Sequence, residues 1–179
     1  PDVSIDKPQH TMWELIVRHK SPPTRKQRFC CRVLKEPGGI GRVVLTGIRA
    51  EESSQRARRQ MVEQCYNLQK SYVHPIIDWT QHDVWSFIRQ NHLPYCQLYD
   101  EGFTRIGCIM CPFGHRTKQL QDAARWPHYY QAYLRAFDRM IEARRAANKP
   151  TTWTTAQEVM DWWLSEDRFQ PDEQLEIFA

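Results

Sequence analysis

The stretch GRVVLTGI, residues 41–48, decides the fold class, because it is the most strand-like run in the chain. Its paired valines are β-branched and favour a strand, and Gly47 ends the run where a strand passes into a loop. Residues 72–79, YVHPIIDW, are expected to form a second short strand that Pro75 interrupts. These two runs predict a small sheet in the first half of the chain.

Helical periodicity dominates the segments around these strands. Apolar residues recur with helical spacing in four segments, which cover residues 12–20, 80–93, 128–147 and 151–167. Thr80 and Asp83 form a near-capping box that starts the second of these helices. The aromatic stripes of the last two helices are expected to pack in the core. The charged stretch 51–65 is expected to be helical or a mobile loop. Early strands and late helices predict an α/β fold with a parallel sheet and a helical C-terminal appendage.

The composition is that of one ordinary folded domain. Of the 179 residues, 41% are hydrophobic and 26% are charged, which excludes a largely disordered chain. No apolar run approaches the about 18 residues that a membrane span requires, and the N-terminus has no secretory leader. We therefore expect a cytoplasmic protein without membrane contact. Because no initiator Met precedes Pro1, we also expect the chain to be a piece of a longer protein.

Four of the six cysteines form two close pairs, which are Cys30 with Cys31 and Cys108 with Cys111. In a reducing compartment such pairs indicate thiolate ligands for zinc or for an iron–sulfur cluster. Adjacent cysteines suit a zinc knuckle poorly, whereas a cubane cluster offers separate iron corners to each. The pattern therefore favours a [4Fe–4S] cluster, with zinc or unmetallated thiols as the alternatives. The two remaining cysteines, Cys65 and Cys96, are expected to be free thiols.

Basic residues flank the first cysteine pair and the predicted strand. The net charge is +4, and the runs 18–35 and 49–59 are rich in arginine and lysine. Arg49 lies at the expected carboxyl end of the first strand, where open α/β sheets bind ligands. Its planar fork suits phosphate or sulfate, and Ser53 and Arg56 add donors to the same loop. The alternative for Arg49 is a surface ion pair with Glu51 or Glu52.

Four segments, in order, resemble the phosphoadenosine phosphosulfate reductase family. They are CCRVLK (30–35), TGIRAEESSQR (46–56), HPIIDWTQHDVWSFIRQNHLPY (74–95) and YDEGFTRIGCIMCP (99–112). The resemblance is to the cluster-bearing, adenylylsulfate-reductase-like members, which are related to the ATP pyrophosphatases of DNA phosphorothioation. It implies an adenine-nucleotide α-hydrolase-like domain, of which residues 1–125 form a part. Residues 126–179 then form a helical extension.

The resemblance also implies roles for individual residues. Cys30, Cys31, Cys108 and Cys111 would hold a [4Fe–4S] cluster beside an ATP or adenylyl sulfate site. Lys35 matches the lysine that the family places near the cluster, and it would act in catalysis with Arg49. The anion would be bound by Arg49, Ser53, Arg56, His115 and Arg116. His74 is expected to be an ordinary loop histidine that forms hydrogen bonds.

The sequence departs from the family at two points. The S-G-G-x-D-S phosphate loop is absent, so we expect it on a missing N-terminal half or on a partner chain. A cysteine in an E-C-G motif near the C-terminus is also absent, so the source of a nucleophilic thiol stays open. Two other functions are therefore considered. One is ATP-dependent sulfur insertion into DNA or tRNA with a sulfur donor protein, and the other is a non-catalytic, zinc-stapled nucleic-acid-binding module.

Overall fold

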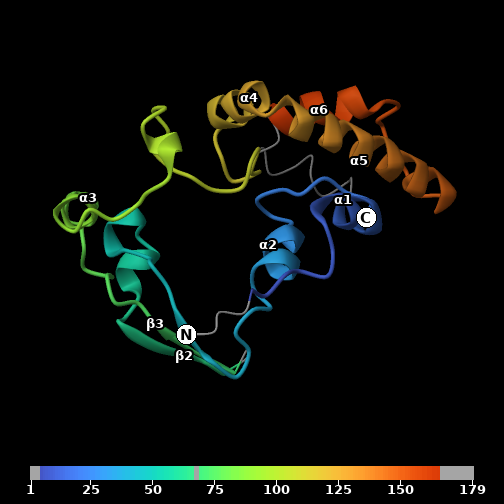
Figure 1. Ribbon diagram of the computed structural model, residues 1–179. Coiled ribbons are helices and arrows are strands. Elements are labelled where there is room, and N and C mark those ends of the chain that lie inside the picture. Colours follow the sequence, from blue (N-terminus) through green and yellow to red (C-terminus); the bar gives the residue numbers. More distant parts are fainter. Residues whose placement is uncertain (1–4, 67–68, 166–179) are drawn as a thin grey trace. The chain divides into compact units, whose positions relative to one another are not determined.

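The computed structural model describes residues 5–66 and 69–165, which form two compact units. Unit 1 contains the chain up to Glu36 and again from Gly107, and unit 2 contains Pro37–Ile106 (Figure 1). Among the residues described, no helix has both the length and the apolar character that crossing a membrane requires. The predicted division into a domain of residues 1–125 and a helical extension of residues 126–179 stays a prediction.

Unit 2 is built on a three-stranded sheet of order β1-β3-β2, whose strands are β1 (Val43–Leu45), β2 (Val62–Cys65) and β3 (Lys70–Val73). The strands β1 and β3 are parallel, as predicted, with Val44 opposite Tyr72. The strand expected over 72–79 is correct only for residues 72 and 73, because β3 ends at Val73, before Pro75. The strand β2 is antiparallel to β3, so the prediction of a purely parallel sheet is wrong. Cys65 pairs with Lys70, and so short a connection joins only antiparallel strands. The α/β class is confirmed.

Outside the sheet, the described residues of unit 2 form the helix α3 (Gln81–Gln90) and several short 3-10 turns. The helix starts at the predicted capping box, in which Thr80 and Asp83 bond each other's backbone N–H groups. The 3-10 turns are η1 (Ala50–Glu52), η2 (Arg56–Arg58) and η4 (Gln97–Tyr99). The expected apolar stripe of α3 is not buried, and Phe87 is 45% exposed. A sheet of three short strands is too small to cover a helix face.

Unit 1 is helical, with α1 (Met12–His19), α2 (Phe29–Leu34), α4 (Arg116–Arg125), α5 (Pro127–Ala146) and α6 (Ala156–Leu164) (Figure 1). The helices α1, α5 and α6 were predicted, although α6 begins after Thr155 rather than near Thr151. The helices α2 and α4 were not predicted. The helix α2 has only six residues, and α4 is too polar to show an apolar period.

The core of unit 1 forms around α5, which packs against α1, α4 and α6. Tyr133 and Phe137 of α5 contact Trp163 of α6, and all three side chains are buried. The indole N–H of Trp163 donates to the carbonyl oxygen of Pro23 at 2.7 Å and anchors the segment between α1 and α2. The aromatic stripes are therefore core, as predicted. This core supports the cysteine-bearing segments.

Candidate cysteine site and arginine loop

The first cysteine pair lies at the start of α2. Phe29 and Cys30 are buried in the core, whereas Cys31 is half-buried. The helix ends at Leu34, and the backbone N–H of its C-cap residue Lys35 donates to the carbonyl oxygen of Cys31 at 3.0 Å. The short helix thus brings Lys35 back over the cysteine pair, one turn later.

The second cysteine pair lies in a tight turn that residues of α4 hold in place. Met110, between the two cysteines, is fully buried and adopts the left-handed conformation, with φ of 53°. Its N–H donates to the carboxylate of Asp122 at 2.9 Å, and its carbonyl oxygen accepts from the amide of Gln119 at 3.5 Å. We call Gln119 and Asp122 the Met110 clamp. Because a left-handed non-glycine residue is strained, these two bonds stabilise the turn.

Two contacts join the segments that carry the two cysteine pairs. The guanidinium group of Arg25 donates to the carbonyl oxygen of Phe113 at 3.1 Å. The guanidinium carbon of Arg28 lies 4.9 Å from the centre of the Phe113 ring. Both contacts lie within unit 1, so the C-C and C-x-x-C segments belong to one packed structure.

The thiols of the two pairs influence each other's ionisation. Burial raises the pKa of Cys30 to about 11, and the neighbouring Cys31 and Cys111 contribute in the same direction. Burial also raises the pKa of Cys111, while the backbone N–H of Phe113 and the charge of Lys35 oppose this rise. Thiols that perturb one another electrostatically lie in the same neighbourhood. All six cysteines are free thiols in the structure.

Lys35 belongs to the same neighbourhood. A hydrogen bond with the side chain of Cys108 raises the pKa of Lys35, and the charges of Cys31 and Cys111 add to the effect. Buried Tyr133 lies beside the site, where its pKa is raised by desolvation and then by three of the cysteines. Lys35 and the four cysteines that the sequence singled out therefore lie near enough to affect one another's pKa values.

The donor set fits an iron–sulfur cluster in kind and number, because four thiolates ligate such a cluster. Within residues 5–66 and 69–165, no three His, Cys, Asp or Glu side chains are gathered closely enough to hold a metal ion. The four thiols are therefore candidate ligands by their chemistry, and the described side chains do not show a closed coordination geometry.

His115 and Arg116 follow the second cysteine pair at the start of α4. His115 is the N-cap residue of this helix without a side-chain cap bond, and both side chains are exposed. Their predicted contact with an anion or with cluster sulfurs stays a prediction.

The arginine loop, residues 49–56, follows the carboxyl end of β1 in unit 2. Arg49 forms ion pairs with Glu51 at 3.2 Å and with Glu52 at 3.4 Å, and Glu52 also pairs with Arg56. The hydroxyl of Ser53 accepts from the N–H of Arg56 at 3.2 Å. Ion pairs with Glu51 and Glu52 thus hold together Arg49 and Arg56, the two arginines that were predicted to bind an anion. An ion pair of Arg49 with one of these glutamates was the alternative expected from the sequence.

A third arginine, which the sequence did not single out, lies near this loop. Burial lowers the pKa of Arg56, and the charges of Arg105 and Arg49 lower it further. Three guanidinium groups therefore share one part of unit 2 with Glu51 and Glu52. Arg105 stands in an irregular segment without periodicity, and only the fold reveals its position near the loop.

His74 is buried beside the end of β1, the strand that precedes the arginine loop. Its Nδ1 lies 2.6 Å from the hydroxyl of Thr46, which continues β1. Its Nε2 has no hydrogen-bond partner among the described residues and lies 3.9 Å from the carboxylate of Glu63. The expected hydrogen-bonded loop histidine is thus found, although only one ring nitrogen is bonded. This histidine connects the ends of two neighbouring strands.

These features define an α/β protein with clustered thiols and an arginine-rich loop after a strand. The family model for the phosphoadenosine phosphosulfate reductase domain matches residues 2–113, more than half of the chain. The protein therefore belongs to the phosphoadenosine phosphosulfate reductase family, as the sequence motifs indicated. The matched region contains every predicted site residue except His115 and Arg116.

Several similar proteins are named as reductases. The adenosine 5'-phosphosulfate reductase of Oceanobacillus iheyensis is 33% identical over 136 residues, covering 70% of this chain and 55% of that protein. That of Allochromatium vinosum is 36% identical over 117 residues, covering 60% and 43%. An uncharacterized 37.8 kDa protein of Escherichia phage 186 is 30% identical over 135 residues, covering 68% and 40%. The chain thus spans about half the length, or less, of these relatives.

Proposed function

We propose that this protein is the cluster-bearing part of an enzyme that reduces an adenylyl sulfonucleotide. The observation that carries the proposal is the gathering of four free cysteines and Lys35 in one part of the molecule. The similarity to proteins named adenosine 5'-phosphosulfate reductase supports the same class of substrate.

In this proposal, Cys30, Cys31, Cys108 and Cys111 hold a [4Fe–4S] cluster. The cluster supplies a thiolate-ligated iron centre when it is bound. The Met110 clamp keeps the second pair in its turn, and α2 presents the first pair. Lys35 partly neutralises the anionic surroundings and attracts the anionic end of the substrate.

The arginine loop binds the phosphate and sulfate oxygens of the nucleotide. The guanidinium groups of Arg49 and Arg56 provide planar donors, and Ser53 offers a neutral hydroxyl. Glu51 and Glu52 hold both arginines in the absence of substrate. A doubly charged anion competes with these carboxylates, because ion pairs near the surface are weak. His115 and Arg116 are proposed to add donors to the anion from the start of α4.

The proposed enzyme needs polypeptide that supplies the phosphate loop and a nucleophilic thiol. Support comes from the sheet of unit 2, where Val43 is 65%, Leu45 is 70% and Val62 is 60% exposed. Apolar side chains on the strands of a sheet are normally covered by another layer. We propose that a preceding segment or a partner chain covers them, and that the enzyme is cytoplasmic.

The cluster is tested by metal content and visible absorbance of protein purified without oxygen. We expect about four irons per chain and broad absorbance near about 400 nm. Cys108→Ser should lose both, whereas Cys96→Ser, at an exposed cysteine outside the site, should keep both. A colourless protein with one zinc per chain would support the non-catalytic module instead.

The reaction is tested with the holoenzyme by two assays. Sulfite release from adenylyl sulfate should be lost in Arg49→Gln and kept in Arg58→Gln, an exposed arginine on η2. Pyrophosphate release from ATP, without sulfite release, would instead favour sulfur insertion into DNA or tRNA.

A further inference from the structure

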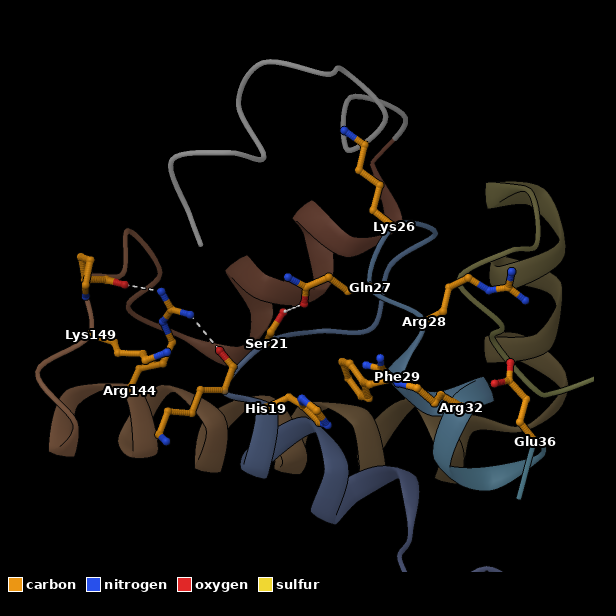
Figure 2. Close-up of a pocket in the computed structure, with 12 residues that line it drawn as sticks. His19, Ser21, Lys26, Gln27, Arg28, Phe29, Arg32, Glu36, Arg144 and Lys149 are labelled. Atoms are coloured by element: carbon orange, nitrogen blue, oxygen red, sulfur yellow. Dashed lines mark hydrogen bonds between the residues drawn. The ribbon is translucent and has the colours of Figure 1, made fainter. Parts of the chain in front are cut away.

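A second basic feature of the molecule is a pocket in unit 1 (Figure 2). Its volume is about 610 Å³, and its walls come from the end of α1, the segment between α1 and α2, α2 itself and the connection between α5 and α6. None of the four site cysteines lines it, and neither does Lys35. The pocket is therefore distinct from the proposed cluster site and carries an inference of its own.

The walls of this pocket are strongly cationic. Five other lysine and arginine side chains line it in addition to buried Arg144, and they are Lys20, Lys26, Arg28, Arg32 and Lys149. The lining contains one carboxylate, that of Glu36. In the described part of the chain, none of these five cations forms an ion pair. Unneutralised cations in one concave surface create a positive potential that attracts anions.

Buried Arg144 fixes the shape of the pocket. It is 3% exposed, and its guanidinium group donates to the carbonyl oxygens of Lys20, at 2.8 Å, and of Pro150 (Figure 2). It therefore joins the end of α1 to the segment after α5. Its Nε has no hydrogen-bond partner among residues 5–66 and 69–165. A buried, unpaired N–H in a pocket wall is a donor that a bound anion or water can satisfy.

The pocket also presents an aromatic ring. His19 stacks on buried Phe29, with ring centroids 4.2 Å apart and an angle of 12° between the planes, and the His19 side chain is exposed. Burial, followed by the charges of Arg32 and Arg18, lowers the pKa of His19. The ring is thus mainly neutral at neutral pH, and its position is set by the phenylalanine behind it.

We propose that this pocket binds single-stranded nucleic acid, with its phosphates on the cations and a base stacked at His19. Grooves that combine cations with an exposed aromatic ring are typical of such binding. The cations belong to separate segments, with Lys26 before α2, Arg32 within it and Lys149 after α5. A chain of phosphates can contact all of these segments, whereas one phosphate group contacts only a few donors.

The proposal is tested by fluorescence anisotropy, with the holoprotein and a labelled oligonucleotide of about 12 nucleotides. The pocket variant is Lys26→Gln with Lys149→Gln, and the matched control is Arg135→Gln with Arg139→Gln, on the exposed face of α5. Both variants remove two charges from unit 1. The pocket variant should lower the slope of log affinity against log salt by about 0.7 for each phosphate that the protein no longer neutralises. The control should keep the slope of the unmodified protein.

His19→Ala tests the stacked base. It should weaken binding about tenfold, the effect expected when one base no longer stacks, without changing the salt slope. Iron content and visible absorbance should be the same in all of these variants. Loss of nucleic-acid binding with an intact cluster therefore separates this proposal from the proposed reductase function.

Three results would overturn the proposal. One is equal weakening in the pocket variant and in the control, which would show only a general effect of net charge. Another is displacement of the oligonucleotide by adenosine monophosphate at equal phosphate concentration, which would indicate a mononucleotide pocket. The third is the absence of any binding at low salt by the unmodified protein.

Discussion

Unit 1 and unit 2 bury their apolar side chains to very different extents. Phe137 and Trp163 of unit 1 are fully buried, as are several aliphatic residues around them. In unit 2, Val43 and Leu45 of β1 are mostly exposed, and Ile77 and Phe103 are its buried large apolar residues in the described part of the chain. Similar residue types therefore serve as core in one unit and as surface in the other.

This difference in burial indicates what keeps each candidate site rigid. The cysteine pairs lie on short elements that pack against the core around α5 through Cys30 and Met110, so the core holds these two segments in place. The arginine loop lies on a small sheet, and its shape depends on ion pairs with Glu51 and Glu52. Ligands for a cofactor need a fixed geometry, whereas a loop that binds and releases a substrate benefits from lower local stability.

The largest expected effect is on the stability of the two units. Phe137→Ala removes a fully buried ring and should lower the free energy of unfolding by about 3–5 kcal/mol. Phe87→Ala removes a ring that is 45% exposed and should cost about 1 kcal/mol or less. Urea unfolding followed by circular dichroism measures both. Similar losses in the two variants would show that the exposed face of α3 is covered in solution.

The sequence predicts those parts of the fold that have a local cause. The capping box of Thr80 and Asp83 and the long apolar stripe of α5 act within one helix, so their patterns predict the elements correctly. The strand β2 was missed because two of its four residues are polar and its formation depends on pairing with β3. The helix α2 was missed because six residues are too few to show a period.

In the candidate sites too, the sequence predicts features with a local cause and misses those that depend on the fold. The spacing of each cysteine motif places its own members within one turn of chain, whereas the contact of Lys35 with Cys108 joins the two motifs and depends on the fold. The Met110 clamp and Arg105 have no sequence signature, because their neighbours are brought together only by the fold. The assigned roles of these residues stay predictions until the cluster and substrate are tested.

An intermediate effect on the free energy of unfolding is expected for a substitution in the Met110 clamp, which connects the unit 1 core to the cysteine site. Asp122→Asn keeps the size of the side chain but weakens the bond to the Met110 N–H and the ion pair with Lys118. We expect the free energy of unfolding to fall by about 1–3 kcal/mol, because a buried charge-assisted hydrogen bond is removed. We also expect iron content to fall.

The matched control is Asp138→Asn, at an exposed aspartate on α5 of the same unit. It should change neither unfolding nor iron content. If Asp122→Asn lowers stability but leaves iron content unchanged, the clamp supports the core and does not position the cysteine turn.

The smallest expected effect is on the acid stability of two helices that both start at a capping box, α1 in unit 1 and α3 in unit 2. Backbone hydrogen bonds with Thr11 and Thr80 lower the pKa values of Glu14 and Asp83, respectively. A lowered pKa in the folded state stabilises the helix above the ordinary carboxyl pKa, and this contribution is lost as the pH falls through the lowered value. Both helices therefore lose their capping boxes in acid.

Packing should determine how readily each helix opens once its capping box is lost. Leu15 and Ile16 hold α1 in the core, whereas no residue of α3 is buried, so the first turn of α3 should open at a higher pH than that of α1. Amide exchange measured by NMR between about pH 5 and pH 2 monitors both turns. Thr80→Ala keeps the backbone N–H but removes the hydroxyl bond, which is the smaller of the two contributions that lower the pKa of Asp83, so it should raise this pKa only part of the way and move the opening of α3 to higher pH. Simultaneous opening of both turns would mean that the cap, and not the core, determines how helices in the two units resist acid.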